Sequence, residues 1–262
     1  MSHLRIAFAG DRDISVWVLR FLIQQGEKPL ALCVSSDERA SHADELIALC
    51  GHLSDQFIFR GRQFRQPDSL EMLRALDLDY IIGIHFPYLI PAQVLSIPRV
   101  GVLNLHPAYL PYNRGWHTPS WAILDGTPYG ATLHFMDAHV DTGDIVCRDR
   151  LDVMPGDTAN MLYQRVKQLE LQVFQTAWPQ IVAGSYQRQQ QDPAAGTTHQ
   201  RHELLAENVQ RIELDTVIEA GRLIQRLRAL TTDRLEEAAY YELGGKRYRI
   251  QVVIHEEGNP KS

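Results

Sequence analysis

The chain has 262 residues, of which 45% are apolar and 22% are charged, and its formal net charge at pH 7 is -6. This composition is that of an ordinary globular protein, with one large domain or one domain plus a small appendage. The negative balance argues against a protein that works by coating nucleic acid, because such proteins carry a basic face or tail.

The amino terminus and the cysteines indicate a reducing compartment. The apolar segment that precedes Asp11 is too short for the core of a signal peptide or for a membrane span. Cys33, Cys50 and Cys147 show no close pairing, so neither a disulfide framework nor a zinc knuckle is indicated. We therefore expect a cytoplasmic protein with reduced thiols and no membrane partner.

Short β-rich runs alternate with helical patterns from residue 4 to residue 86. In order they are LRIAFAG, ISVWVLRFLIQQG, PLALCVSS, HADELIALCG, QFIFR, SLEMLRALD and YIIGIHF. Strands that alternate with helices predict right-handed βαβ units and a mostly parallel sheet, an α/β fold of Rossmann-like type. The runs VGVLNLH, GATLHFMD and GDIVCRDRLDV predict three further strands, and a long helix is expected from about Thr158 to about Val182.

The composition changes after this helix. The stretch GSYQRQQQDPAAGTTHQ is polar and Gln-rich, with Pro193 and Gly196 as breakers, and predicts a connection. Beyond it, LDTVIEAGRLIQRLRALT has helical periodicity, and AAYYELGGKRYRIQVVI predicts a hairpin that turns at Gly244 and Gly245. The apolar stripe of the helical pattern consists of Ile218, Leu223, Ile224 and Leu227. We divide the chain into a main domain at 1–184, a linker at 185–202 and a small helix-plus-hairpin module at 203–262.

Asn104 and His106 lie two residues apart at the end of an apolar run. In an extended strand they point to the same face, at the carboxyl end where open parallel sheets bind ligands. Asp141 follows in the glycine-containing loop HVDTGDI. Taken singly, each has an ordinary structural explanation, such as a loop cap or a satisfied core histidine. The other ten histidines show no such linkage, and none forms a metal-ligand pattern, so no metal is expected.

The order of NLHPAYLP, Arg114-Gly115 and HVDTGDI resembles the formyltransferases that use a folate one-carbon donor, over roughly residues 1 to 185. The resemblance implies that N10-formyltetrahydrofolate is the co-substrate of a catalytic domain at 1–184. It also implies that Asn104 and His106 stabilise an oxyanion, while Asp141 orients His106 and helps to move protons. Formyl transfer to an amine needs hydrogen-bond donors and a proton acceptor, because the tetrahedral intermediate carries an oxyanion and the attacking nitrogen loses a proton.

The same resemblance predicts a folate slot between two segments. Residues of HFPYLIP would line one side, with backbone groups facing the pterin ring, although they could equally be core residues that end a strand. The loop from Asp137 to Asp141 would close the other side. The residues predicted to contact folate are Phe86, Tyr88, Leu89, Ile90, Asp137, His139 and Val140.

Three acceptors compete: a purine-precursor ribonucleotide, methionyl-tRNA and a nucleotide-linked amino sugar. Enzymes of the first type usually end near the catalytic domain, which leaves 203–262 unexplained. The tRNA enzymes append a domain that should be basic, whereas residues 185–262 contain 11 Lys or Arg and 12 Asp or Glu, and the loop SSDERASHADE is acidic. We therefore expect an amino-dideoxy sugar on dTDP, of the kind used in lipopolysaccharide O-antigen, with methionyl-tRNA as the alternative. Two alternatives come from other functional classes. One is a hydrolase that passes the formyl group to water, and the other is a folate-binding protein without enzymatic activity.

Resemblance to the sugar-nucleotide class predicts the remaining contacts. The carboxyl-terminal module would bind the nucleotide or the partner subunit of a homodimer. Tyr240 and Tyr241 could stack on the base or simply pack on the preceding helix. Arg12 could approach a phosphate or be a solvated surface residue. The residues predicted to contact the acceptor are Arg12, Tyr112, Asn113, Arg114, Gly115, Trp116, His117, Tyr240 and Tyr241.

Overall fold

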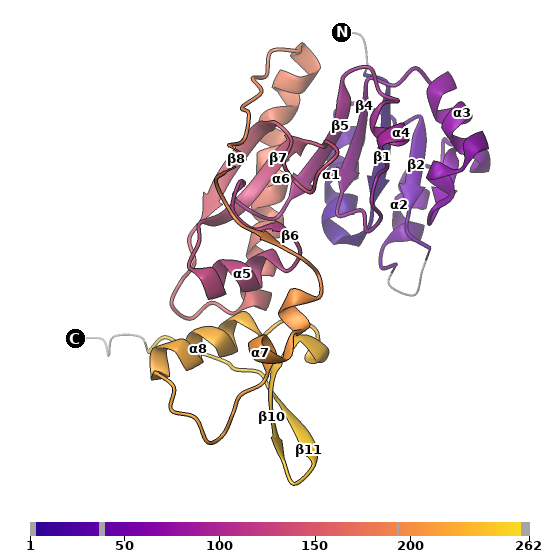
Figure 1. Cartoon of the computed structure of the whole chain (residues 1–262). Coiled ribbons are helices and arrows are strands. Elements are labelled where there is room, and N and C mark those ends of the chain that lie inside the picture. Colours follow the sequence, from indigo (N-terminus) through magenta and orange to yellow (C-terminus); the bar gives the residue numbers. More distant parts are fainter. Residues whose placement is uncertain (1–3, 37–39, 193, 258–262) are drawn as a thin grey trace. The chain divides into compact units, whose positions relative to one another are not determined.

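The structure is a computed structural model that describes residues 4–36, 40–192 and 194–257 (Figure 1). Pro193 of the predicted linker and part of the acidic loop at 35–45 lie outside the described residues. Within the described ranges, no helix is both long and apolar enough to cross a membrane.

A seven-stranded sheet with the strand order β3-β2-β1-β4-β5-β7-β8 forms the centre of the α/β region. β1 pairs in parallel with β2 and β4, and β4 with β5, whereas β5 and β7 are antiparallel. The predicted mostly parallel sheet is confirmed. Its strands are β1 (Ile6–Gly10), β2 (Ala31–Val34), β3 (Ile58–Arg60), β4 (Tyr80–Ile84), β5 (Gly101–His106), β7 (Tyr129–Phe135) and β8 (Ile145–Leu151).

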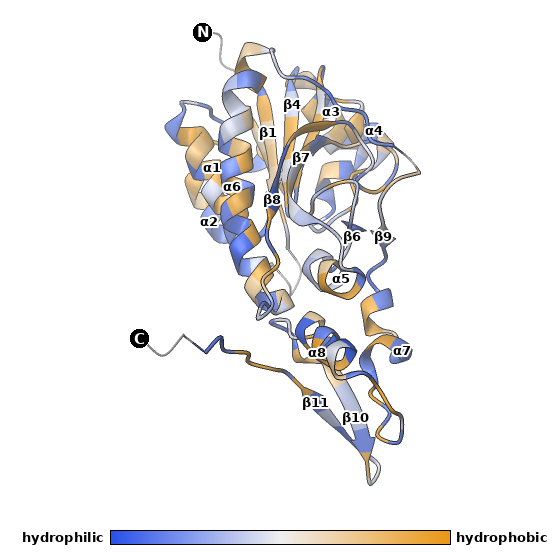
Figure 2. Cartoon of the chain, turned by 90° about the vertical axis from the view of Figure 1, so that its left-hand side faces the viewer, coloured by the Kyte–Doolittle hydropathy of each residue, from blue (hydrophilic) through white to orange (hydrophobic). Residues whose placement is uncertain are grey.

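Helices cover both faces of this sheet. In Figure 2, α1 and α6 lie on one side of the strands, and α3 and α4 lie on the other. Every residue of β1, β2 and β4 is buried, as expected for parallel strands covered on both faces. The helices of this region are α1 (Arg12–Gln24), α2 (Ala43–Leu49), α3 (Pro67–Ala75), α4 (Ala92–Leu95) and α6 (Ala159–Ala183), with short 3-10 turns η1 (Asp55–Phe57) and η2 (Gln63–Arg65).

The chain separates into two compact units. The first unit consists of Met1–His106, Ala131–Asp149 and Leu169–Pro193, and the second of Pro107–Gly130, Arg150–Gln168 and Ala194–Ser262. Each unit is made of segments from several parts of the sequence. The units therefore do not test the predicted domain boundaries at residues 184 and 202, which stay a prediction.

The second unit has its own small core, where Leu204, Leu230 and Ala239 pack with Trp121 and Leu227. The predicted hairpin is present, and both glycines at its turn have positive φ. The elements of the unit are β6 (Arg114–Gly115), α5 (Thr118–Asp125), β9 (Thr198–His199), η3 (Glu203–Leu205), α7 (Glu207–Gln210), α8 (Ala220–Ala229), η4 (Leu235–Glu237), β10 (Ala239–Leu243) and β11 (Lys246–Ile250).

The predicted helix at 214–231 is shorter than its apolar periodicity indicates. α8 begins only at Ala220, and the Thr216 hydroxyl donates to the Glu213 carbonyl in a local turn that competes with the helix. Ile218 therefore precedes the helix, and it is 40% exposed, while Ile224 is 49% exposed. The predicted apolar stripe is not one buried face.

Candidate active site

Asn104 and His106 lie at the carboxyl end of β5, in the first unit. Asn104 pairs in register with His134 of β7, and His106 with Thr132. Their positions two apart place both side chains on one face of the strand. His106 is only 6% exposed. The strand end thus presents an amide and an imidazole in a largely buried setting.

Asp141 comes from the loop between β7 and β8 and reaches both residues. Its Oδ1 lies 3.4 Å from Asn104 Nδ2, and its Oδ2 lies 3.6 Å from His106 Nε2. Asp141 has a φ of 55°, in the left-handed region that Asp and Asn tolerate better than most residues. The structure therefore brings together the three residues that the sequence predicts as catalytic.

The main chain around Asp141 is held by a residue from the predicted linker. Gln191 Nε2 donates to the carbonyl oxygens of Asp141, at 2.9 Å, and of Gly143, at 2.7 Å. A Cβ on Gly143 would lie 2.0 Å from the Phe135 carbonyl oxygen, so only glycine fits there. The glycine of the Asp-Thr-Gly sequence thus has a steric reason, and Gln191 is a supporting residue that the sequence analysis missed.

His134 is a second residue that the sequence analysis missed, contrary to the expectation that the other histidines are unlinked to the site. It is 1% exposed, and its Nδ1 donates to the Phe135 carbonyl oxygen at 2.7 Å. Nε2 lies 3.1 Å from Asn104 Nδ2 and 3.6 Å from Asp141 Oδ1, and with the proton on Nδ1 it can accept a hydrogen bond from the Asn104 amide. His134 therefore orients the Asn104 amide. Its sequence signal is a histidine between two apolar residues, Leu133 and Phe135, in a buried strand.

The two predicted folate segments both lie in the first unit. Phe86 packs edge to face on Phe64 and Tyr88, with ring centroids 5.3 and 5.2 Å apart. Leu89, by contrast, is 79% exposed. The segment is therefore packed at its aromatic residues and open to solvent at Leu89.

The second predicted folate segment is held in place by Asp137. Its Oδ1 accepts hydrogen bonds from the main-chain N–H of His139, at 2.9 Å, and from the Thr142 hydroxyl, at 2.7 Å. Val140 at the tip of this loop is 48% exposed. Phe86, Tyr88, Ile90 and Met136 pack against one core cluster, which links the two segments.

The predicted acceptor residues of the loop after β5 lie in the second unit. Asn113 is fully buried and donates to the Thr127 hydroxyl at 3.0 Å, and Arg114 is also buried. Trp116 is 45% exposed, and Tyr112 is half-buried. Burial lowers the pKa of His117, with Glu237 opposing and Arg234 adding to this effect. Within the loop, Trp116 is the large side chain that is available to a ligand.

The remaining predicted contacts are divided between the units. In the first unit, Arg12 Nη1 lies 3.6 Å from Asp11 Oδ2. In the second unit, Tyr240 is 4% exposed, and the guanidinium groups of Arg247 and Arg249 lie 3.9 and 4.9 Å from its ring centroid. The ring of Tyr241 stacks on that of Tyr248 at 5.2 Å. Tyr240 is thus a packed residue of the hairpin.

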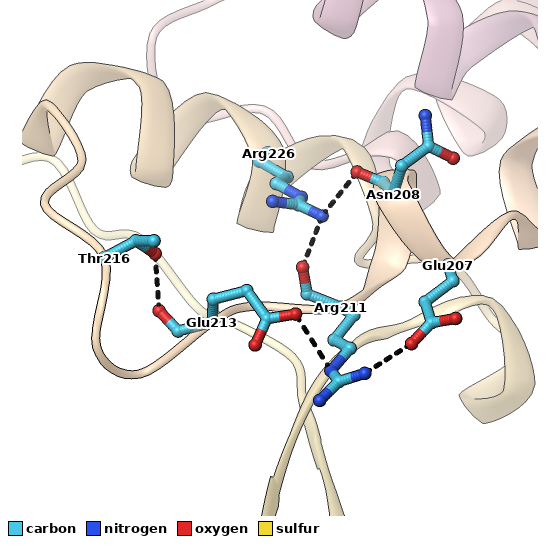
Figure 3. Close-up of a pocket in the computed structure, with 6 residues that line it drawn as sticks. All are labelled: Glu207, Asn208, Arg211, Glu213, Thr216 and Arg226. Atoms are coloured by element: carbon cyan, nitrogen blue, oxygen red, sulfur yellow. Dashed lines mark hydrogen bonds and ion pairs between the residues drawn. The ribbon is translucent and has the colours of Figure 1, made fainter.

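A surface cavity of about 590 Å³ lies elsewhere in the second unit (Figure 3). Arg211 is paired with Glu207 and Glu213, and Arg226 donates to the carbonyl oxygens of Asn208 and Arg211. Both arginines that line the cavity are therefore already paired with other groups of the protein. No group of three or more potential metal ligands occurs among the described residues.

Comparisons with known proteins identify the family. Residues 25–178 match the formyl transferase family, and residues 206–256 match the N-formyltransferase dimerization C-terminal domain. The chain belongs to the formyl transferase family, which confirms the predicted resemblance.

Curated relatives carry two kinds of name. The methionyl-tRNA formyltransferase of Geobacter sulfurreducens is 29% identical over 73% of this chain and 62% of its own length, and that of Xanthomonas axonopodis pv. citri is 31% identical over 96% and 81%. The dTDP-4-amino-4,6-dideoxyglucose formyltransferase of Mycobacterium bovis is 29% identical over 68% and 74%. The chain spans slightly more than three fifths of the length of several of the tRNA enzymes that it matches.

Solved structures share the fold. A sugar N-formyltransferase from Shewanella sp. superposes with a TM-score of 0.81 at 20% identity, over 97% of this chain and 99% of the other. An N-formyltransferase from Helicobacter canadensis, in complex with folinic acid and dTDP-3-aminofucose, superposes with a TM-score of 0.69 at 18% identity, over 92% and 85%. At 18 to 20% sequence identity, these superpositions establish a shared fold alone.

Proposed function

We propose that the protein transfers the formyl group of N10-formyltetrahydrofolate to the amine of an amino-dideoxy sugar carried on dTDP. The observation that carries the chemistry is the cluster of Asn104, His106 and Asp141 within 3.4 to 3.6 Å at the carboxyl end of β5. Membership of the formyl transferase family gives that cluster its reaction class. The use of such sugars in the biosynthesis of lipopolysaccharide O-antigen stays a prediction.

In this proposal the amide and the imidazole act on the developing oxyanion. The donor, when bound, would supply the activated formyl carbon, with Leu89 and Val140 as exposed apolar contacts for its ring system. Asn104 has two amide hydrogens, of which one is held by His134 at 3.1 Å and the other by Asp141 at the longer distance of 3.4 Å. The longer bond is the weaker, so that hydrogen is the one that an oxyanion can take. Asp141, relieved of this contact, accepts the proton that the amine loses, by way of His106 or water. When the tetrahedral intermediate collapses, the bond between the formyl carbon and N10 of the donor breaks, and the same proton returns to the leaving N10 nitrogen.

Charge and the carboxyl-terminal match favour a sugar nucleotide over tRNA. Residues 185–262 carry a net charge of -1, whereas affinity for RNA depends on neutralising phosphates. Residues 206–256 match a domain that is described for N-formyltransferases and for dimerization. Methionyl-tRNA remains the second candidate because the relatives from G. sulfurreducens and X. axonopodis carry that name.

The test is a comparison of acceptors. The full chain is incubated with N10-formyltetrahydrofolate and, in separate reactions, with dTDP-linked 3-amino and 4-amino dideoxyhexoses or with methionyl-tRNA. We expect one dTDP-sugar to gain the mass of one formyl group, while methionyl-tRNA stays unchanged. Formylation of methionyl-tRNA alone would replace the proposed acceptor, and release of formate without any formylated product would indicate a hydrolase.

We also propose a homodimer formed through residues 206–256. Seven aliphatic side chains within this segment are 40% or more exposed, and four of them lie close together in the sequence, namely Leu214, Val217, Ile218 and Ile224. Such a concentration of exposed apolar surface is typical of an interface. Light scattering should give the mass of two chains for the wild type and a mass close to one chain for Val217→Lys combined with Ile224→Lys. Met161→Lys, which changes an exposed apolar residue outside the segment, is the control, and a dimeric double variant would refute this interface.

A further inference from the structure

We propose that residues 197–201 form a strap that positions the loop 113–117 and thereby determines how tightly the formyl acceptor is bound. The strap lies in the stretch that the sequence predicts as a linker, between residues 25–178 and residues 206–256, which match the two known domains. This inference rests on the proposed function, because the loop is the predicted acceptor loop. All the contacts that carry it lie within the second unit.

Main-chain pairing fastens the strap to the loop. β9 pairs in parallel with β6, with Arg114 opposite Thr198 and Gly115 opposite His199. The N–H of Arg114 donates to the Thr197 carbonyl oxygen at 2.9 Å, and the N–H of Trp116 donates to the His199 carbonyl oxygen at 3.0 Å. The backbone on both sides of Gly115 is therefore tied to the strap rather than left to adapt to a ligand.

Gly115 permits this close approach. Its φ is 90°, which L side chains rarely adopt, and a Cβ there would lie 2.2 Å from the His199 carbonyl oxygen. Gly126 in the same unit also has a positive φ, of 63°, but a Cβ there would meet no atom within 4 Å. Comparison of these two glycines separates the contact with the strap from the backbone strain.

His199 anchors the strap to the body of the unit. Its ring stacks on Trp121, with centroids 4.0 Å apart and an interplanar angle of 3°. Its two ring nitrogens lie within ion-pair distance of carboxylates, Nε2 at 3.0 Å from Asp125 Oδ2 and Nδ1 at 3.4 Å from Glu203 Oε2. An imidazole that is stacked on an indole and flanked by two carboxylates has little freedom to turn, so the main-chain oxygen of His199 is a fixed acceptor for the loop.

The far end of the strap holds the exposed side chain of the loop. The guanidinium of Arg201 lies 5.1 Å from the ring centroid of Trp116, within the range of a cation–π contact. His117 Nε2 donates to the Arg201 carbonyl oxygen at 3.2 Å. An aromatic ring that is 45% exposed is thus presented at a fixed place. Pre-ordering of this kind raises affinity because the ordering cost is met before the ligand binds.

The test uses one variant of the strap and one of the loop, each with a matched control. His199→Ala removes the anchor, and His202→Ala removes an exposed histidine three residues further on. Gly115→Ala is paired with Gly126→Ala. We expect His199→Ala in the strap and Gly115→Ala in the loop to raise the KM for the dTDP-sugar about tenfold or more, with the KM for the formyl donor unchanged, because only the acceptor loop is disturbed. Both controls should stay within about twofold of the wild type.

Hydrogen exchange gives a readout that does not depend on activity. The amides of Arg114 and Trp116 should be protected in the wild type and should exchange faster in His199→Ala, with β4 and β5 unchanged. Faster exchange without any change in the acceptor KM would make the strap purely structural and overturn the positioning role. Unprotected amides in the wild type would overturn the strap itself. Failure of every sugar to accept a formyl group would instead overturn the proposed function, and the exchange result would be unaffected by that failure.

Discussion

Replacing Asn104 with alanine, or His106 with asparagine, is expected to lower kcat at least about a hundredfold, because removal of one oxyanion donor costs about 10²- to 10³-fold in rate. Each substitution removes a group from the carboxyl end of β5 without changing a backbone hydrogen bond of the sheet. The KM values should change little if the interaction forms only in the transition state. Steady-state kinetics with the formylated dTDP-sugar as the product provide the measurement.

The controls of this experiment separate catalysis from folding. Asn104→Ala leaves the buried Nε2 of His134 without its donor, which costs about 1 to 3 kcal/mol, so the unfolding temperature is measured alongside the rate. His52→Asn changes another histidine of the first unit, whose Nε2 bonds the Pro29 carbonyl at 2.9 Å, and should keep near-normal turnover. Near-normal turnover in Asn104→Ala or His106→Asn would remove the cluster from the proposed mechanism.

His134→Gln extends the same series to the residue that orients Asn104. Glutamine retains a polar group at the site, but it has no rigid ring tied to the Phe135 carbonyl. The amide of Asn104 should therefore lose its fixed orientation, and we expect a smaller fall in rate than for Asn104→Ala. A fall as large as that of Asn104→Ala would mean that the imidazole itself takes part in the reaction.

The sequence predicts the sheet and the reacting cluster because both depend on local patterns. Alternating strands and helices indicate the parallel sheet, and a spacing of two places Asn104 and His106 on one face. The sequence does not predict the roles of His134 and Gln191. Their roles depend on the pairing of β5 with β7 and on a chain segment that returns 50 residues after Asp141, and no local pattern carries such long-range information.

The carboxyl-terminal region shows the opposite error. The apolar period of residues 214–231 predicts one long helix, yet the helix starts at Ala220 and two residues of the stripe are exposed. Periodicity reports which side chains are to be covered, but it does not say whether another part of the chain or a second subunit covers them. The polar, Gln-rich stretch predicts a linker for a similar reason, although its residues 198 and 199 form a strand and His199 is packed on Trp121.

The second large effect is expected at Asp141. Asparagine tolerates the left-handed backbone that Asp141 adopts, and Gln191 bonds the main-chain oxygen rather than the side chain, so Asp141→Asn should leave the loop in place. The carboxylate is lost, and with it the group that accepts the proton. We expect kcat/KM to fall at least about a hundredfold at neutral pH, as is typical when a general base is removed. Asp144→Asn, three residues further along the same loop, is the matched control, and calorimetry should show that both variants still bind the dTDP-sugar.

The dependence of this loss on pH separates two roles for the carboxylate. The attacking amine must be neutral, and its neutral fraction rises with pH until the pH exceeds its pKa, so kcat/KM of the wild type should rise through that range. A base that only removes the proton of the ammonium group becomes dispensable once the amine is already neutral. Recovery of Asp141→Asn at high pH would therefore limit Asp141 to that single deprotonation. A loss that persists at every pH means that the carboxylate also orients His106 and accepts the proton released as the C–N bond forms, which is the outcome that the 3.6 Å contact between Asp141 Oδ2 and His106 Nε2 favours.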